Sequence, residues 1–196
     1  MGASLVLLVS GCSSAGEAGD HHGSQGHDST SQEAGAHNDA DTSFARDMIP
    51  HHEQAIVMSD IILAKQGIDP RVVELANQIK SAQGPEIDTM RGWLVEWGSP
   101  SMAPGHEGHD MVGDASSHEE MGMMSEQDLE QLRQAQGPDA SRLFLTGMIE
   151  HHDGAVKMAQ TEIDTGRSDP AIHLAHKMIE DQQREIEAMK QILESL

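Results

Sequence analysis

The chain has 196 residues, enough for one domain with tails, and carries 33 acidic against 12 basic side chains. Its formal net charge of −21, with His neutral, and its lack of any basic cluster exclude nucleic acid as a partner and favour cations. Aromatic residues make up only 2%, whereas Met and His number 13 each, and this joint enrichment is typical of proteins that bind soft metals.

The first segment, residues 1–12, contains a short apolar run that ends in the sequence VSGC at Cys12. This ending resembles the cleavage box of bacterial lipoproteins, in which the cysteine becomes the lipidated first residue. A single cysteine also excludes an internal disulfide. We therefore expect an exported protein held by lipid on Cys12 at the outer side of the cytoplasmic membrane. The alternative is a tail with an incidental cysteine.

The next segment, residues 13–41, consists mainly of Gly, Ser, Ala, His and acidic residues, with almost nothing to bury. Such a composition predicts a disordered tether. It contains four histidines, His21, His22, His27 and His37.

Residues 42–97 predict a first pair of helices. Thr42 or Ser43 is the expected N-cap of the first helix, and Gly67 is its expected end. Asp69, followed by proline at the first helical position, is the expected N-cap of the second helix. Because the connection between the two helices is short, they must fold back as an antiparallel hairpin.

Two prolines interrupt this hairpin in the sequence. Pro50 falls inside the first helix, and the pair Gly84-Pro85 falls inside the second. Proline removes a backbone donor and clashes with the preceding turn, so each interruption is expected to kink its helix.

Residues 98–124 form a second low-complexity segment that links the two helical halves. It is rich in Gly, Pro and acidic residues and supplies eight potential ligands for a loosely held metal: Met102, His106, His109, Met111, His118, Met121, Met123 and Met124. We expect a flexible linker with modest metal affinity.

The last segment, residues 125–196, predicts a short helix and a second hairpin. Ser125 begins a capping-box pattern for the short helix. A helix over about 140–165 should end at Gly166, and Asp169-Pro170 should open a last helix that runs to the C-terminus.

The two hairpins are copies of one another. The sequence FARDMIPHHEQAIVM from Phe44 aligns with FLTGMIEHHDGAVKM from Phe144, an offset of 144 − 44 = 100. After one deleted residue the match continues at an offset of 99, from Leu75 to Met90 against Leu174 to Met189. Two such hairpins bury each other's apolar faces as an all-α, four-helix bundle, interrupted by the Met/His-rich linker.

The motif places its Met and His side chains on one face of each helix. At about 100° per residue, the motif residues of each copy share an arc of about 120°. These residues are Met48, His51, His52, Ala55 and Met58 in the first copy, and Met148, His151, His152, Ala155 and Met158 in the second. Two such faces turned inward could present four His and four Met to one interior.

These residue types favour copper. Thioether sulfur is soft and neutral and prefers Cu(I) or Ag(I) to Zn(II) or Mg(II), while imidazole also accepts Cu(II). Met90 and Met189 match across the repeat and could add sulfur ligands. The alternative for the methionines is core packing, and for the histidines a buried hydrogen bond.

The paired sequences MIPHH and MIEHH, with Ala and Met following, and the pattern Gln-x2-Glu-Ile-x2-Met resemble the bacterial family catalogued as domain of unknown function 305. The resemblance covers about residues 41–196. It implies a ferritin-like four-helix bundle and extracytoplasmic copper binding or copper resistance. It points to the same eight residues of the motif, Met48, His51, His52, Met58, Met148, His151, His152 and Met158.

We therefore expect a copper-binding protein for sequestration, tolerance or delivery, with no organic cofactor and a copper donor or acceptor protein as a partner. One alternative is a ferritin-like oxidoreductase, which would need Glu and Glu-x-x-His ligands on facing helices. The acids next to the motif, Glu53, Glu150 and Asp153, are about 100° away from the His face and do not supply that pattern. Another alternative is a structural or stress lipoprotein whose metal binding is incidental.

Overall fold

The computed structural model describes residues 36–99 and 121–196, and these residues form helices and connecting loops without strands. The helices are α1 (Asp39–Leu63), α2 (Pro70–Glu96), α4 (Glu126–Gln134), α5 (Gly137–Thr165) and α6 (Asp169–Ser195). None of the helices described in these two ranges has the length and hydropathy of a membrane span. Cys12, most of the predicted tether and linker residues 100–120 lie outside the described residues.

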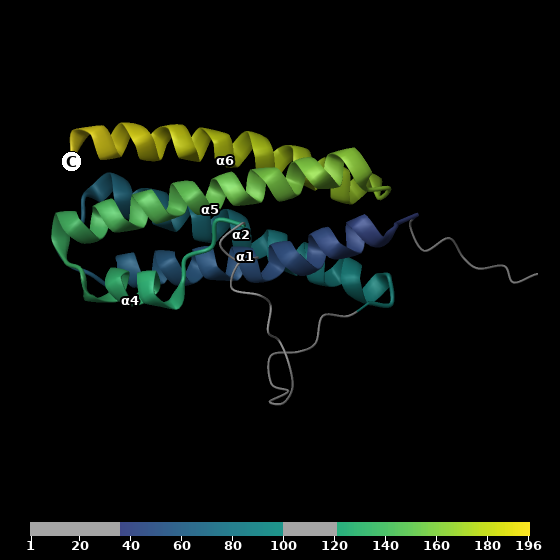
Figure 1. Cartoon of the computed structure of the whole chain (residues 1–196), viewed down its shortest axis with the longest axis horizontal. Helices are drawn as coiled ribbons and strands as arrows, with labels where there is room; N and C mark the ends of the chain where they lie inside the picture. The colour runs from purple at the N-terminus through teal and green to yellow at the C-terminus, as the bar shows by residue number, and fades with distance from the viewer. Residues whose placement is uncertain (1–35, 100–120) are drawn as a thin grey trace, which may run out of the picture. The chain divides into compact units, whose positions relative to one another are not determined.

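The helices form the predicted pair of hairpins (Figure 1). Helix α1 packs along α2, and α5 packs along α6, each pair antiparallel. The two hairpins meet mainly through α1 and α5, which also run in opposite directions, whereas α2 and α6 touch only slightly. The short helix α4 lies against α1 and α5. The result is the expected four-helix bundle with one short helix on its side.

The first helix begins earlier and ends earlier than the sequence predicted. Asn38 is the N-cap and forms a capping box with Asp41, so the prediction of Thr42 or Ser43 is wrong and the end of the predicted tether is helical. The helix ends at Leu63. Gly67 does not end it but lies in the following loop with a φ of 71°, a conformation that favours glycine.

The other predicted starts are largely confirmed. Asp69 accepts a hydrogen bond from the backbone of Arg71 as the N-cap of α2, and Ser125 caps α4. At α6, however, Ser168 occupies the N-cap without a side-chain bond, and Asp169 is the first helical residue. Helices α1 and α2 continue past their internal prolines, so neither proline ends its helix.

Aromatic side chains stack near the end of α2. The rings of Trp93 and Trp97 lie 5.8 Å apart, and the ring of His37 stacks on Trp97 at 4.9 Å with the planes 9° apart. His37, near the end of the predicted tether, thus lies against α2. The Trp pair packs against the core beside Met90.

The core consists of two apolar clusters. The first cluster contains Leu75 and Ile79 of α2, Leu145 of α5 and Ile186 of α6, together with the two buried leucines of α4. The second cluster contains Phe44 and Ile49 of α1 with Ile87 and Leu94 of α2, and alanines of α5 and α6. Small residues such as Ala55 and Ala155 are fully or almost fully buried in these clusters and let α1 and α5 approach each other closely.

A buried pair of acids fixes the start of α1 to the connection between α5 and α6. Asp41 is fully buried, and its carboxylate accepts backbone N–H bonds from Asn38, Arg167 and Ser168 at 2.5 to 3.2 Å. Burial raises the pKa of Asp41, but hydrogen bonds from Glu162 and these backbone groups bring it below its usual value. Glu162 is 1% exposed, and burial beside Asp41 raises its pKa to about 8.

Replacing Glu162 with glutamine should therefore stabilise the protein at alkaline pH. Between pH 4.5 and about 8 the native carboxyl of Glu162 keeps a proton that the unfolded chain releases, so native stability falls as pH rises. Glutamine can donate to Asp41 at any pH and removes this slope, about 1.4 kcal/mol per pH unit. Thermal melting at pH 5, 6.5 and 8 measures how the stability of wild type and Glu162→Gln depends on pH. The control is Glu53→Gln, which replaces an exposed acid. If the difference in melting temperature between Glu162→Gln and wild type is the same at all three pH values, the prediction is contradicted.

Candidate metal centre

Four histidines meet midway along α1 and α5, where the two helices cross. His51 and His52 lie on α1, His151 and His152 on α5, and all four side chains are 0% exposed. The rings of His51 and His151 face each other with their centroids 3.7 Å apart and their planes tilted by 35°. The crossing thus brings two repeat-equivalent residues into contact, as the inward orientation of both motifs predicted.

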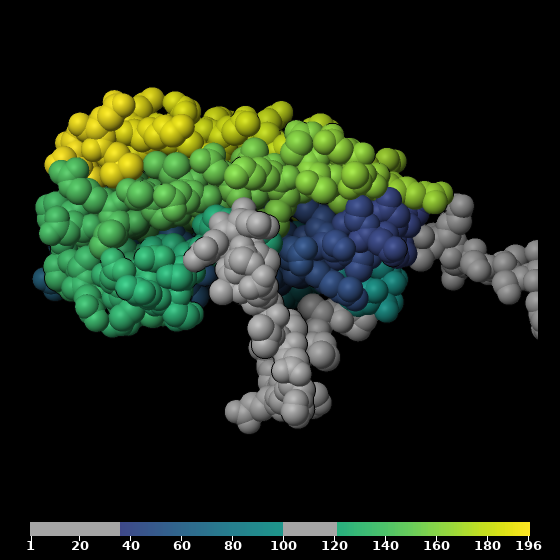
Figure 2. Space-filling view, in the orientation of Figure 1, coloured from purple at the N-terminus to yellow at the C-terminus, as the bar shows by residue number. Residues whose placement is uncertain are grey.

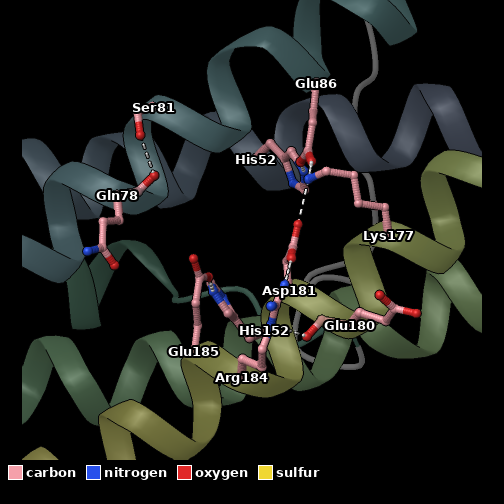
Figure 3. Close-up of polar contacts among 10 residues, drawn as sticks. All are labelled: His52, Gln78, Ser81, Glu86, His152, Lys177, Glu180, Asp181, Arg184 and Glu185. Atoms are coloured by element: carbon pink, nitrogen blue, oxygen red, sulfur yellow. Dashed lines mark hydrogen bonds and ion pairs between the residues drawn. The ribbon is translucent and has the colours of Figure 1, made fainter.

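The second histidine of each motif is held by a carboxylate of its own hairpin (Figure 3). Nε2 of His52 donates to Glu86 on α2 at 2.9 Å, and Nε2 of His152 donates to Glu185 on α6 at 2.6 Å. The two acids are repeat equivalents at the offset of 185 − 86 = 99. Because an ionised carboxylate only accepts, Nε2 carries the proton in both rings and Nδ1 is left with a free lone pair.

The first histidine of each motif differs between the halves. Nε2 of His51 donates to the backbone carbonyl of Met121 at 2.9 Å, whereas neither ring nitrogen of His151 has a hydrogen-bond partner in the described part of the chain. Five buried ring nitrogens lack a partner among residues 36–99 and 121–196, namely Nδ1 of all four histidines and Nε2 of His151. An unpaired buried polar atom costs about 1–3 kcal/mol, so five in one layer favour a ligand that would pair with them.

Burial keeps the rings of His51, His52 and His151 uncharged. It lowers the pKa of His51 to about 3, although the bond to Met121 opposes the shift. Burial also lowers the pKa of His52 against the opposing effect of Glu86. The pKa of His151 lies well below its usual value because of burial and the neighbouring imidazoles. Neutral imidazole is the form that binds a metal ion, so these rings need not lose a proton first.

The methionines of the motif lie on both sides of the histidine layer. Met58, Met148 and Met189 belong to the first apolar cluster, and Met48 and Met90 belong to the second, against which Met158 packs. Because α1 and α5 are antiparallel, the methionine that precedes the histidines in one copy meets the methionine that follows them in the other. Within the bundle interior predicted to hold four His and four Met, the sulfurs therefore form two sets, one on each side of the histidine layer.

The structure thus places all ten predicted ligands in or beside one buried region. Nine are fully buried, and only Met158 is partly exposed. Among residues 36–99 and 121–196, no three side chains of His, Cys, Asp and Glu converge as they would around one metal ion. A site in the described part of the chain would therefore combine imidazole nitrogen with thioether sulfur, which suits Cu(I) and Ag(I).

Sequence reasoning missed residues at this centre. The acids that contact histidine are Glu86 and Glu185, whereas the motif acids, such as Glu53, are exposed as expected. The repeat could have identified both acids, because the pair Glu-Ile occurs at equivalent positions in the two halves, at the offset of 99. Nothing in the repeat marked Met178, which joins the second cluster, because its counterpart at 178 − 99 = 79 is Ile79.

The two halves differ in the charges around their Glu–His pairs. Nζ of Lys177 lies 3.6 Å from Glu86 and also pairs with Asp181. At the offset of 99 the counterpart of Lys177 is Gln78, which carries no charge to compensate Glu185 (Figure 3). The centre is duplicated in its backbone and its ligands but not in its electrostatics.

Residues 121–124, called the strap below, cross α1 and α5 over the histidine layer. Gln54 of α1 holds the strap at two points, since its side chain donates to the carbonyl of Met124 at 2.9 Å and accepts from the Met124 amide at 2.8 Å. The carbonyl of Met121 accepts from His51. On α5, Gly154 leaves the space for this approach, because a β-carbon there would lie 1.7 Å from the Met121 oxygen.

The variant Gly154→Ala should therefore displace the strap and destabilise the protein by about 2 kcal/mol. The matched control is Gly92→Ala on α2, where a β-carbon meets nothing within 4 Å and the gain in helix propensity should stabilise by about 0.5–1 kcal/mol. Thermal melting gives the stabilities, and hydrogen exchange at the Met124 amide reports the strap. A Gly154→Ala variant that melts like wild type with a protected Met124 amide would refute this account of the strap.

Comparison with known proteins gives one consistent group. The family model described as domain of unknown function (DUF305) matches residues 41–193, and no curated protein matches the sequence. A DUF305 fragment from Deinococcus radiodurans is 29% identical with a TM-score of 0.69, covering 81% of this chain and 98% of its own. A DUF305 protein from Streptomyces coelicolor, described as secreted, is 30% identical with a TM-score of 0.68, covering 83% and 93%.

A further solved structure is CopM in its Cu(I)-bound form. It is 29% identical with a TM-score of 0.63, covering 79% of this chain and 96% of its own. CopM also matches in its Cu(II)-bound and silver-bound forms, with identities of 33% and 28%.

Proposed function

This chain belongs to the DUF305 family, and from that membership we propose that it is an extracytoplasmic copper-binding protein that holds Cu(I) for sequestration, tolerance or delivery. The observation that carries the proposal is the layer of four fully buried histidines with five unpaired ring nitrogens. CopM, which has the same fold, binds Cu(I), Cu(II) and silver. Both the donor atoms and the family relationship support copper as the ligand.

The donor set fits Cu(I) better than harder ions. Each side of the histidine layer offers several thioethers, and the carboxylates of Glu86 and Glu185 are already engaged with Nε2 of a histidine. Glu86 and Glu185 fix the tautomer and direct Nδ1 of His52 and His152 away from the carboxylates, as acids commonly do behind metal-binding histidines. Cu(I) readily accepts such mixed nitrogen and sulfur coordination.

The test is a Cu(I) titration against a competing chromophoric chelator. The double variant His51→Ala with His151→Ala should lose the tightest Cu(I) site, with affinity reduced about a hundredfold or more, because two of the four buried donors are gone. The double variant His173→Ala with His176→Ala removes two exposed histidines of α6 and should keep that site. Circular dichroism checks the fold, and the glutamine pair replaces the alanine pair if the latter does not fold. Unchanged affinity in the alanine or glutamine pair would refute the proposal.

We further propose export and anchoring through lipid on Cys12, as the first residues predict. A copper donor or acceptor protein completes the proposed function, since a binding protein must exchange its ion. The proposal is for binding without turnover. Copper-loaded protein that consumes oxygen in proportion to an added reductant would favour the oxidoreductase alternative instead.

A further inference from the structure

A hollow of about 200 Å³ opens on the surface where the strap meets α4 and α5. Among the residues that the structure describes, its charged lining side chains are Asp128 of α4 and Glu150 of α5, both acidic. Figure 2 shows α4 and α5 side by side on this face of the protein. The electrostatic potential at this point therefore attracts cations.

Two thioethers line the same hollow. Met123 and Met124 are both partly buried, so their side chains reach the solvent side of the hollow as well as the protein. The Met124 side chain lies against Gly147 of α5, where a β-carbon would come within 2.9 Å of its sulfur. The counterpart of Gly147 at 147 − 100 = 47 is Asp47, so only the second half has room for this side chain.

Met124 also packs against the first apolar cluster, which contains Met58, Met148 and Met189. Met124 therefore lies between the surface hollow and an apolar cluster that contains three buried methionines. The two hydrogen bonds between Gln54 and the backbone of Met124 fix its position without using its side chain.

We propose that this hollow is a surface binding site for a soft monovalent cation, Cu(I) or Ag(I), held by the sulfurs of Met123 and Met124, and that Met124 passes the ion to the buried methionines. This assignment rests on the proposed function and adds a route by which the ion reaches the buried site. The carboxylates of Asp128 and Glu150 raise the local concentration of cations, while the neutral thioethers select the soft ones. Few donors and partial exposure keep the site weak enough to release its ion inward.

Transfer kinetics test the route. Cu(I) is supplied as its complex with a chromophoric chelator, and the loss of colour gives the uptake rate. The volume-conserving pair Met123→Leu with Met124→Leu should slow uptake about tenfold while the equilibrium occupancy of the histidine site persists. Glu150→Gln should slow Cu(I) uptake about twofold to threefold. The matched control Glu74→Gln, which replaces an exposed acid on α2, should leave the uptake rate unchanged. Wild-type rates in the leucine pair and in Glu150→Gln would overturn the proposal.

Methyl NMR of methionine tests the site directly. In the His51→Ala, His151→Ala background, Ag(I) should shift the Met123 and Met124 methyl signals, because coordination at sulfur is sensed by the adjacent carbon. If hydrogen exchange at the Met124 amide shows that the leucine pair releases the strap, this NMR experiment decides whether the sulfurs of Met123 and Met124 bind the ion. Unmoved Met123 and Met124 signals alongside shifts of other methionines would overturn this inference alone. A wild-type protein that takes up neither ion would overturn the proposed function as well.

Discussion

Lowering the pH from 7 to 5 is expected to destabilise the metal-free protein by about 2 kcal/mol through His51 alone. The unfolded chain protonates this histidine below about pH 6.5, whereas burial keeps the native ring neutral down to about pH 3. Unfolding therefore takes up a proton at His51 throughout this interval, and the contribution of this histidine to native stability falls as the pH falls. The pKa values of His52 and His151 are lowered in the same direction and add to the effect.

Glu162 has the opposite slope, which a substitution at His51 leaves unchanged, so comparing a His51 variant with wild type isolates the histidine. Urea unfolding at pH 7, 6 and 5 measures the stability directly. Between pH 7 and 5, His51→Gln should gain about 2 kcal/mol of stability relative to wild type. His176→Gln, which removes an exposed histidine of α6, should leave the slope unchanged. Identical slopes in wild type and His51→Gln would show that burial of this ring does not control the acid stability.

The second large effect is expected in the selectivity between metals at acid pH. Cu(I) affinity should fall far less than Zn(II) affinity between pH 7.5 and 5.0. An exposed imidazole competes with protons in this range, whereas the buried ring of His51 stays neutral down to about pH 3 and a thioether has no proton to gain. A buried site of imidazole and sulfur can therefore retain Cu(I) at pH 5, while Zn(II), which does not favour the thioethers of the two methionine sets, depends on exposed histidines that take up protons.

Replacing Met48 and Met148 together with leucine should abolish this advantage. Leucine approximates the volume of methionine, so packing in each apolar cluster is largely kept while one sulfur is lost from each. Affinities of wild type and the leucine pair for both metals, measured at the two pH values with competing chelators, give the comparison. If Cu(I) and Zn(II) affinities of wild type decline in parallel, the imidazoles bind the metal and the methionines serve only as packing.

The repeat in the sequence was sufficient to predict the architecture. A motif found twice at an offset of 100 residues requires two equivalent helices, and a short connection such as the one around Gly67 requires a hairpin. The inward face of each helix followed from the spacing of Met48, His51 and Met58, and the structure buries all three. Periodicity on one helix is a local property, so it can be determined without a partner.

Features that depend on the relative direction of two helices could not be predicted in this way. The division of the methionines into two sets follows from the antiparallel crossing of α1 and α5. The bond between His52 and Glu86 joins residues 34 positions apart on different helices. Pairing of Asp41 with Glu162 depends on where the ends of α1 and α5 meet, and neither residue belongs to a recognisable motif.

The contact between His51 and His151 also bears on the origin of the protein. When a residue touches its own counterpart, it lies on a two-fold axis, as in a symmetric homodimer. The duplicated chain therefore has the arrangement of a homodimer whose two protomers have been joined into one polypeptide. In a homodimer every substitution occurs twice, whereas a fused chain can change one half and keep the other.

Three features of this chain use that freedom. Lys177 lies beside Glu86, whereas the equivalent residue in the other half is the uncharged Gln78. Glu162 is replaced by Ile62 in the other half, at 162 − 100 = 62. Among the described residues, the strap forms a hydrogen bond with His51 and none with His151. None of the three can exist in a strictly symmetric dimer. Fusion thus gave one ancestral half-site two descendants that can diverge in charge and in access while the helices that carry them stay the same.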